Sequence, residues 1–218
     1  MMKHNIVQIY TLALSKSSHL LDAYFDLLND QEKEKAARFI KPTDSYNYKV
    51  HKIFEKLVLA KHLQCPPREI ILKTDQLGKP LSPRGLFYSK SHSGNFVVIA
   101  LATFNIGIDI ELTTTDENTQ IMSDVLHPEE SFKEDQFFTI WSCKEAYLKF
   151  LGTGLSKSMN EVKLESLPGG TYTCDSRGAL RDLKIDVGYA CYLCSPCELE
   201  INVELLGHFD SLNSIQNL

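Results

Sequence analysis

Two carboxylates stand close together in the segment Gly107-Ile108-Asp109-Ile110-Glu111. Residues 106–112 alternate between apolar and polar types, which is the pattern of a half-buried strand. Asp109 and Glu111 therefore project from the same face of the predicted strand, beside Gly107, which has no side chain that could block a ligand. Two carboxylates held this close repel each other unless a cation or a proton lies between them.

A second charged pair lies in residues 141–149, where the sequence predicts a helix with Glu145 and Lys149 one turn apart on the same face. A carboxylate pair on a strand together with a Glu/Lys pair on a helix suggests a hard-metal site that acts on phosphate. Each pair taken alone is also typical of solvated surface charge. The functional interpretation therefore depends on which motifs accompany these pairs and on their order along the chain.

A third motif, Ser91-His92-Ser93-Gly94, supplies hydroxyl and imidazole donors suited to phosphate oxygens. Gly78-Lys79-Pro80 precedes it, and the turn Gly152-Thr153-Gly154 follows the predicted helix. These motifs, in this order with Gly107–Glu111 and the segment 141–149, resemble the surfactin-synthetase-activating type of 4′-phosphopantetheinyl transferase. The resemblance covers roughly residues 30–165 of the sequence.

The resemblance implies an α+β fold of two pseudo-symmetric halves with the active site between them. It also implies transfer of 4′-phosphopantetheine from coenzyme A to a serine of an apo acyl or peptidyl carrier protein, with release of 3′,5′-ADP. Such carriers serve fatty acid or polyketide biosynthesis and secondary metabolism. Since Mg²⁺ prefers carboxylate and phosphate oxygens, we assign Asp109, Glu111 and Glu145 as its ligands. Glu145 is also the expected proton acceptor, and Lys149 is expected to neutralise the phosphate or protonate the leaving group.

Further residues are predicted to bind the coenzyme A phosphates. The resemblance places Lys79 at the 3′-phosphate, and Ser91 and His92 at phosphate oxygens. Three basic residues are weaker candidates for phosphate contacts: Lys144, Lys35 and Arg38. Two positions depart from the family pattern, since Asn47 and Glu32 stand where basic residues would favour coenzyme A binding.

These departures keep two other functions open. The same carboxylates could serve a metal-dependent pyrophosphate hydrolase. A non-catalytic module that binds coenzyme A or a carrier protein is the third alternative, suggested by Asn47 and Glu32. The sequence does not specify which carrier is modified or whether acyl-coenzyme A is accepted.

Charge is distributed unevenly along the 218 residues, although the net charge is only −5. Residues 1–105 hold 15 Lys and Arg against 9 Asp and Glu, and residues 106–218 hold 8 against 19. We therefore predict a basic half, 1–105, that binds the nucleotide phosphates and an acidic half, 106–218, that carries the metal-binding carboxylates. No membrane is expected as a partner, because no apolar run approaches the ~18 residues of a spanning helix, and no nucleic acid is expected either. We expect a monomer.

The six cysteines include the series Cys191, Cys194 and Cys197, whose spacing could suggest a zinc or iron–sulfur site. On a strand, Cys191 and Cys194 would face opposite ways, and no fourth cysteine follows at a ferredoxin spacing. Reduced thiols in a cytoplasmic protein are the favoured interpretation. The N-terminal segment 1–14 fits a first strand better than a signal peptide.

The spacing of apolar residues and the positions of capping and turn-forming residues predict the remaining helices and strands. In the first half we expect helices over 18–28, 31–40 and 44–62, with Asp30 and Asp44 as N-caps of the last two. A strand over 69–73 follows, and strands 86–89 and 95–102 are joined by a turn over 90–94. The second half is predicted to contain a strand over 106–112, a loop over 113–124, helices over 128–132 and 134–151, and strands over 161–166, 170–174, 182–186, 188–195 and 198–206.

Overall fold

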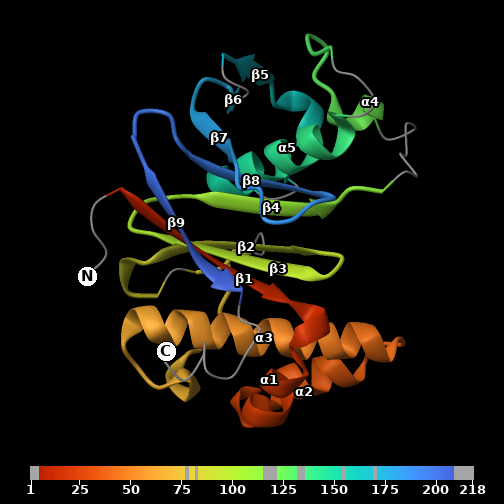
Figure 1. Ribbon diagram of the computed structural model, residues 1–218, viewed down its shortest axis with the longest axis vertical. Helices are drawn as coiled ribbons and strands as arrows, with labels where there is room; N and C mark the ends of the chain where they lie inside the picture. Colours follow the sequence, from red (N-terminus) through yellow and green to blue (C-terminus); the bar gives the residue numbers. More distant parts are fainter. Residues whose placement is uncertain are drawn as a thin grey trace. The chain divides into compact units, whose positions relative to one another are not determined.

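The computed structural model describes residues 5–76, 79–81, 83–114, 122–131, 136–153, 156–168 and 171–208. Its helices and strands (Figure 1) confirm the α+β class. The strands form a four-stranded sheet in the order β2-β3-β1-β9 and a five-stranded sheet in the order β4-β8-β7-β6-β5. The bounds are β1 Ile6–Ala13, α1 Ser18–Tyr24, α2 Asp30–Ala37, α3 Pro42–Leu63, β2 Phe87–Ser93, β3 Phe96–Ala102, β4 Gly107–Leu112, α4 Met122–Val125, α5 Phe137–Leu151, β5 Leu164–Leu167, β6 Thr171–Cys174, β7 Gly178–Asp182, β8 Tyr189–Pro196 and β9 Asn202–His208.

The chain divides into two compact units. Thr74–Gly94 and Val98–Leu205 make up most of one unit, here called the strand-rich unit, and Tyr10–Lys73 makes up most of the other, the helical unit. No helix in the described part of the chain is long and apolar enough to cross a membrane. All six cysteines are free thiols.

The helical unit is organised around α3, on which α1 and α2 pack. Helix α3 buries Val50, Ile53, Phe54 and Val58, whose spacing gives one apolar face. Its first turn contains Pro42, whose missing N–H needs no partner at that position, so the predicted cap at Asp44 is wrong.

The sequence suggested Asp30 as the N-cap of α2, but the N-cap is Asn29. The Asn29 side chain accepts from the Glu32 amide at 2.8 Å, and the Glu32 carboxylate accepts from the Asn29 amide at 2.9 Å. This reciprocal pair is a capping box, which satisfies two N–H groups that a helix start otherwise leaves unpaired.

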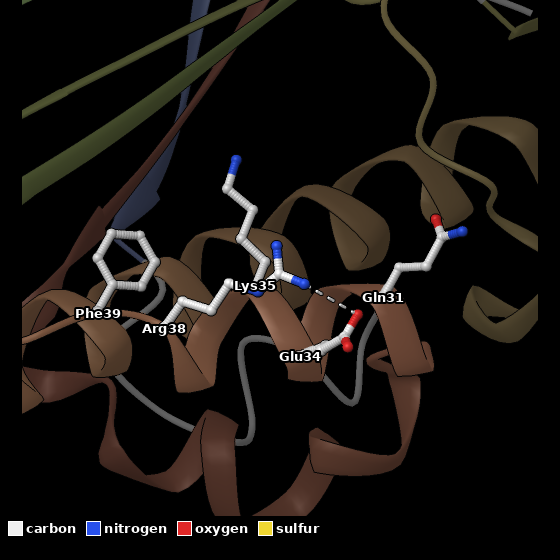
Figure 2. Close-up of a pocket in the computed structure, with 5 residues that line it drawn as sticks. All are labelled: Gln31, Glu34, Lys35, Arg38 and Phe39. Atoms are coloured by element: carbon white, nitrogen blue, oxygen red, sulfur yellow. Dashed lines mark ion pairs between the residues drawn. The ribbon is translucent and has the colours of Figure 1, made fainter.

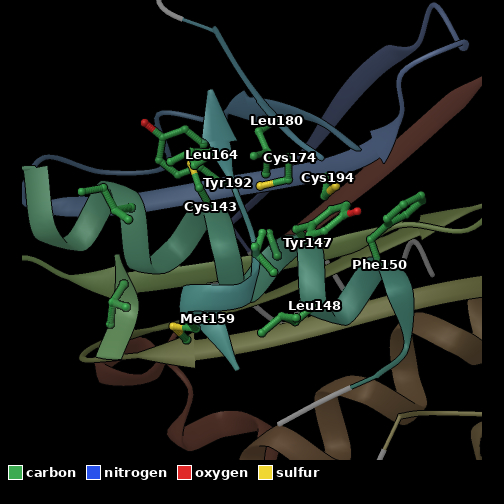
Figure 3. Packing of buried hydrophobic residues seen from close by; sticks show 14 of the residues in the cluster. Cys143, Tyr147, Leu148, Phe150, Met159, Leu164, Cys174, Leu180, Tyr192 and Cys194 are labelled. Carbon is green, nitrogen blue, oxygen red and sulfur yellow. The ribbon is translucent and has the colours of Figure 1, made fainter. Parts of the chain in front are cut away.

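The strand-rich unit is built on α5, which packs against β4 and β8 of the five-stranded sheet. Strand β4 lies at one edge of that sheet and pairs antiparallel with β8, with Asp109 opposite Tyr192. Figure 3 shows how side chains of α5 meet side chains of the sheet in the apolar core. The labelled core residues are Cys143, Tyr147, Leu148, Phe150, Met159, Leu164, Cys174, Leu180, Tyr192 and Cys194.

Several predicted elements differ from those observed. Residues 69–73 form no strand; a 3-10 turn spans Pro67–Glu69, and of the adjacent isoleucines Ile70 is buried while Ile71 is exposed. The strand predicted over 182–186 is wrong: β7 spans Gly178–Asp182, residues 183–186 form no strand, and Lys184 adopts a left-handed backbone with φ 50°. Residues 128–131 are not helical, and a short helix, α4, lies instead within the predicted loop.

Two further strands, β5 and β9, begin later than predicted. Strand β5 begins only at Leu164, after a 3-10 turn over Met159–Glu161. Strand β9 begins at Asn202 and joins the four-stranded sheet beside β1. Parts of the predicted motifs and loops lie outside the described residues: Gly78, Gly154, 115–121, 132–135, residue 170 and the segment after 208.

Candidate active site

Strands β2 and β4 run side by side and are joined through serine side chains. Ser89 Oγ accepts a hydrogen bond from the Ile108 amide at 3.0 Å, and Ser93 Oγ accepts one from the Leu112 amide at 3.0 Å. Ser91 lies between them on the same face of β2, because side chains two residues apart in a strand share a face. Strand β2 extends through Ser93, so this motif is on a strand and not in the turn that the sequence predicted.

Asp109 is the buried centre of the site, with an exposed fraction of 2%. Its Oδ1 accepts hydrogen bonds from Ser91 Oγ at 2.7 Å and from Lys149 Nζ at 2.6 Å. Lys149 Nζ also donates to Ser91 Oγ at 3.0 Å, so the three groups form a closed triangle. The second carboxylate, Glu111, accepts from Ser93 Oγ at 2.9 Å.

Helix α5 reaches this site because Gly107 allows it to lie directly on β4. A Cβ atom at Gly107 would clash with the carbonyl oxygen of Ala146 and the amide nitrogen of Phe150. The sequence suggested that Gly107 leaves room for a ligand, but the backbone of α5 fills that room. The close approach brings Lys149 to Asp109, with half-buried Glu145 one turn earlier on the helix.

Glu111 and Glu145 both have raised pKa values. Burial is the largest cause of the raised pKa of Glu111, and the negative charges of Asp109 and Glu145 add to it. Burial also raises the pKa of Glu145, where Asp109 adds to the shift and Lys149 opposes it. The site therefore concentrates negative charge that the single ammonium of Lys149 only partly balances.

His92 follows Ser91 on β2. Partial burial of its ring lowers its pKa, and the positive charges of Lys149 and Lys90 lower it further. The ring is therefore neutral near pH 7, and a neutral imidazole still offers one N–H donor. This agrees with a hydrogen-bonding role and not with a fixed positive charge.

The donor set fits a hard divalent cation. Within the described residues, no three His, Cys, Asp or Glu side chains already converge as a metal cluster. Asp109 Oδ2 is nevertheless buried without any hydrogen-bond partner. Burial of an unpaired carboxylate oxygen costs free energy, and a cation shared with Glu111 and Glu145 would offset that cost and the mutual repulsion.

Lys144 does not reach this site, which corrects the prediction that it contacts phosphate. Its ammonium is fully buried and donates to Glu130 Oε2 at 2.7 Å, to the Val125 carbonyl at 2.7 Å and to the Met159 carbonyl at 3.2 Å. Burial lowers the pKa of Lys144, while the contact with Glu130 raises it. All three N–H donors are used, so this lysine joins α5 to the segments around it.

Lys79 lies at the C-terminal end of α5. Its ammonium donates to Asn105 Oδ1 at 3.0 Å and to the Phe150 carbonyl at 3.4 Å. Burial lowers its pKa, and the charge of Asp75 opposes that shift. These contacts are with protein groups in the strand-rich unit.

Lys35 and Arg38 belong to the helical unit, where they line an open pocket of about 610 Å³ (Figure 2). The lining residues are Gln31, Glu34, Lys35, Arg38 and Phe39. Lys35 Nζ lies 5.3 Å from the centre of the Tyr48 ring, and the exposed Arg38 pairs with Glu34 at 3.4 Å. The two predicted cations thus share one pocket.

Glu32 is buried and its carboxylate pairs with a lysine of the same unit. It is 7% exposed, and its carboxylate accepts a 2.6 Å hydrogen bond from Lys56, which also donates to the Leu27 carbonyl. Its charge is therefore neutralised inside the helical unit. The side chain belongs to a helix cap and a buried ion pair, and the effect of Glu32 on coenzyme A binding stays a prediction.

The sequence did not reveal the roles of several residues that shape the site, although Ser93 was part of the predicted phosphate-binding motif. Ser93 orients Glu111, Ser89 binds the backbone of β4, Asn105 contacts the end of α5, and Glu130 pairs with Lys144. The alternating serines at 89, 91 and 93 were a usable signal, because they share one face of a strand. Nothing in the local sequence marks Asn105 or Glu130.

The site in this α+β fold combines three carboxylates, a lysine and serine hydroxyls on adjoining elements, which is a set of groups suited to binding phosphate. Comparison with known families identifies the chain further. Residues 15–104 match the family described as 4′-phosphopantetheinyl transferase, N-terminal, and residues 105–194 match the 4′-phosphopantetheinyl transferase superfamily. The chain belongs to this superfamily.

Individual relatives carry the same activity in their names. The chain is 24% identical to 4′-phosphopantetheinyl transferase Sfp of Bacillus subtilis (strain 168), over 80% of this chain and 84% of the relative. It is 28% identical to 4′-phosphopantetheinyl transferase HetI of Nostoc sp., over 74% of this chain and 75% of the relative. A third relative, 4′-phosphopantetheinyl transferase gsp of Aneurinibacillus migulanus, is 25% identical over 76% of this chain and 75% of its own length.

Proposed function

We propose that the protein transfers the 4′-phosphopantetheine group of coenzyme A to a serine hydroxyl of an apo acyl or peptidyl carrier protein. The observation that carries the proposal is the hydrogen-bonded triangle of buried Asp109 with Ser91 and Lys149, with Glu145 one turn away on α5. The matches to transferases support this activity, and they give no support to a pyrophosphate hydrolase or a non-catalytic binding module.

In the proposed reaction the serine oxygen of the carrier forms a bond to the phosphorus that bears the pantetheine arm. The bond from that phosphorus to the bridging oxygen breaks, and 3′,5′-ADP leaves. Glu145 accepts the proton of the serine hydroxyl, and its raised pKa makes it a stronger base than an exposed carboxylate. Lys149 stabilises the negative charge that develops on the leaving phosphate.

We further propose that the enzyme depends on Mg²⁺, held by Asp109, Glu111 and Glu145. When bound, the ion neutralises pyrophosphate charge and orients the oxygens around phosphorus. The unpaired Asp109 Oδ2 and the raised pKa of Glu111 support this assignment. The serines of β2 keep both strand carboxylates in place.

Coenzyme A is proposed to place its phosphates at Ser91 and His92 on β2, where hydroxyl and imidazole donors lie beside Lys149. Within the helical unit, Lys35 and Arg38 stay weaker candidates for a phosphate contact, because their pocket offers two cations and enough volume for a phosphate group. A cytoplasmic location and a monomeric state stay predictions.

The test is incubation of the protein with coenzyme A, Mg²⁺ and a panel of apo carrier proteins. We expect the phosphopantetheine adduct on a carrier serine, detected by mass spectrometry, together with 3′,5′-ADP. Reactions without carrier and reactions with chelator serve as controls. Rapid release of 3′,5′-ADP without carrier would contradict the transferase and favour a hydrolase, and full activity in chelator would exclude the metal requirement.

A further inference from the structure

The backbone at Lys79 is held by hydrogen bonds to Asp75. Asp75 and Lys79 bind reciprocally, since the Asp75 amide donates to the Lys79 carbonyl at 2.9 Å and the Lys79 amide donates to Asp75 Oδ1 at 2.9 Å. An antiparallel bridge between Thr74 and Pro80 closes the same loop. The half-buried side chain of Lys79 therefore extends from a backbone position that is held in place.

The ammonium of Lys79 caps the end of α5. Helix α5 ends at Leu151, so the Phe150 carbonyl is one of the last four, which lack partners within a helix. That carbonyl accepts hydrogen bonds from Lys79 Nζ and from the side-chain amide of Asn105. Lys79 Nζ also donates to Asn105 Oδ1 at 3.0 Å. A positive charge at this end of a helix is further stabilised by the helix dipole.

The residue that terminates α5 makes room for this contact. Gly152 has a left-handed backbone with φ +76°, and its amide donates to the Leu148 and Lys149 carbonyls. A Cβ atom at Gly152 would lie 3.1 Å from both Cδ and Nζ of Lys79. Glycine thus serves the helix end twice, through its backbone conformation and through the space left for the lysine.

The cap joins the three segments that build the active site. Lys79 comes from the loop before β2, Asn105 lies two residues before β4, and Phe150 follows Lys149 directly on α5. A shift of the helix end would move Lys149 away from Asp109, to which it now donates at 2.6 Å. Misplacement of reacting groups by about 1 Å lowers rates by roughly a hundredfold.

We propose that Lys79 is a positioning residue, which with Asn105 holds the C-terminal end of α5 so that Lys149 and Glu145 meet the strand carboxylates. Recognition of the coenzyme A 3′-phosphate is not its main role. This inference rests on the proposed transferase function. It replaces the expectation, drawn from the family resemblance, that Lys79 faces the 3′-phosphate.

The test compares Lys79→Met with wild type on two donors, coenzyme A and 3′-dephospho-coenzyme A, with one apo carrier. Loss of positioning lowers kcat by roughly ten- to hundredfold on both donors by the same factor, with little change in KM. Asn105→Ala, which removes no charge, should show the same pattern to a smaller degree. Lys73→Met removes an exposed lysine nearby and should leave both rates unchanged.

Hydrogen exchange supplies a readout that does not depend on activity. In Lys79→Met, the amide of Gly152 and its neighbours in the last turn of α5 should exchange faster than in wild type. An effect confined to coenzyme A and seen in KM, with unchanged exchange at the helix end, would overturn the positioning role and restore the phosphate contact. Absence of transfer by the wild-type protein would instead refute the proposed function, and the exchange measurement would still decide whether the cap exists.

Discussion

Gly107→Ala is the substitution that tests most directly how the active site is assembled. The new Cβ would meet the backbone of α5 at Ala146 and Phe150, so no side-chain rotation can relieve the clash. Restoring ordinary carbon contacts of about 3.5 Å requires a displacement on the order of 1 Å between α5 and β4. Overpacking of this kind costs about 1–3 kcal/mol of unfolding free energy.

The same displacement separates Lys149 from Asp109, so the effect on transfer should exceed the effect on stability. We expect the transfer rate to fall by roughly a hundredfold, because a 1 Å misplacement of reacting groups has about that effect. The melting temperature should fall by roughly 2–12 °C, at about 2–4 °C per kcal/mol for a domain of this size. Differential scanning calorimetry and initial rates of carrier modification measure the two effects.

Gly85→Ala is the matched control for this experiment. Gly85 has a left-handed backbone with φ +76°, but a Cβ there would meet no atom within 4 Å. The substitution should cost about 1–2 kcal/mol of backbone strain and leave the transfer rate unchanged. Wild-type stability and wild-type transfer in Gly107→Ala would refute the close packing of α5 on β4, and equal loss of transfer in both variants would show that reduced stability alone explains the effect.

Four further substitutions probe single residues. Asp109→Ala should abolish transfer while the circular dichroism spectrum stays native, because the variant loses the acceptor shared by Ser91 and Lys149. Near-normal turnover of this variant at saturating Mg²⁺ would exclude Asp109 as a metal ligand. Glu145→Gln should lower transfer at least ~10²-fold while calorimetric coenzyme A binding changes little, and an equal loss of both would argue against a proton acceptor. Lys144→Met leaves the buried carboxylate of Glu130 without its counter-ion, so urea denaturation should show a loss of about 3–5 kcal/mol. The double variant with Glu130→Gln should regain much of this loss, and no loss in Lys144→Met would mean that the pair is not buried in solution. Burial lowers the pKa of His62 from 6.5 to about 4, so the unfolded chain takes up the proton at a higher pH than the folded protein. The free energy of unfolding should therefore fall by about 2 kcal/mol as the pH drops from 6.5 to 4, after allowance for partial exposure of the ring. His62→Gln should remove this pH dependence from denaturation curves.

The sequence by itself determined the local geometry of the site. Alternation over 106–112 placed Asp109 and Glu111 on one face of a strand, and helical spacing placed Glu145 and Lys149 on one face of α5. These relations hold because a strand repeats every two residues and a helix every 3.6, so a short segment is enough to fix them. The order of the motifs along the chain indicated the resemblance to the 4′-phosphopantetheinyl transferase family.

The tertiary structure decided what each charged side chain binds. Lys144 and Lys149 lie on the same helix, yet one pairs with Glu130 and the other with Asp109. Glu32 forms an ion pair with a lysine 24 positions later in the sequence. The cap of Lys79 on α5 joins residues 71 positions apart. Contacts over such separations depend on how whole elements pack, which no local spacing encodes.

The serines of β2 show which part of the site follows from the sequence and which part depends on the tertiary structure. Residues 89, 91 and 93 repeat every second position, which is visible in the sequence, but their partners on β4 lie 18 or 19 positions further along the chain. Only packing of β2 against the edge strand β4 turns the three hydroxyls into partners for a buried backbone and two carboxylates. Sequence periodicity sets the direction of each side chain, and long-range packing of the strands and helices supplies its partner.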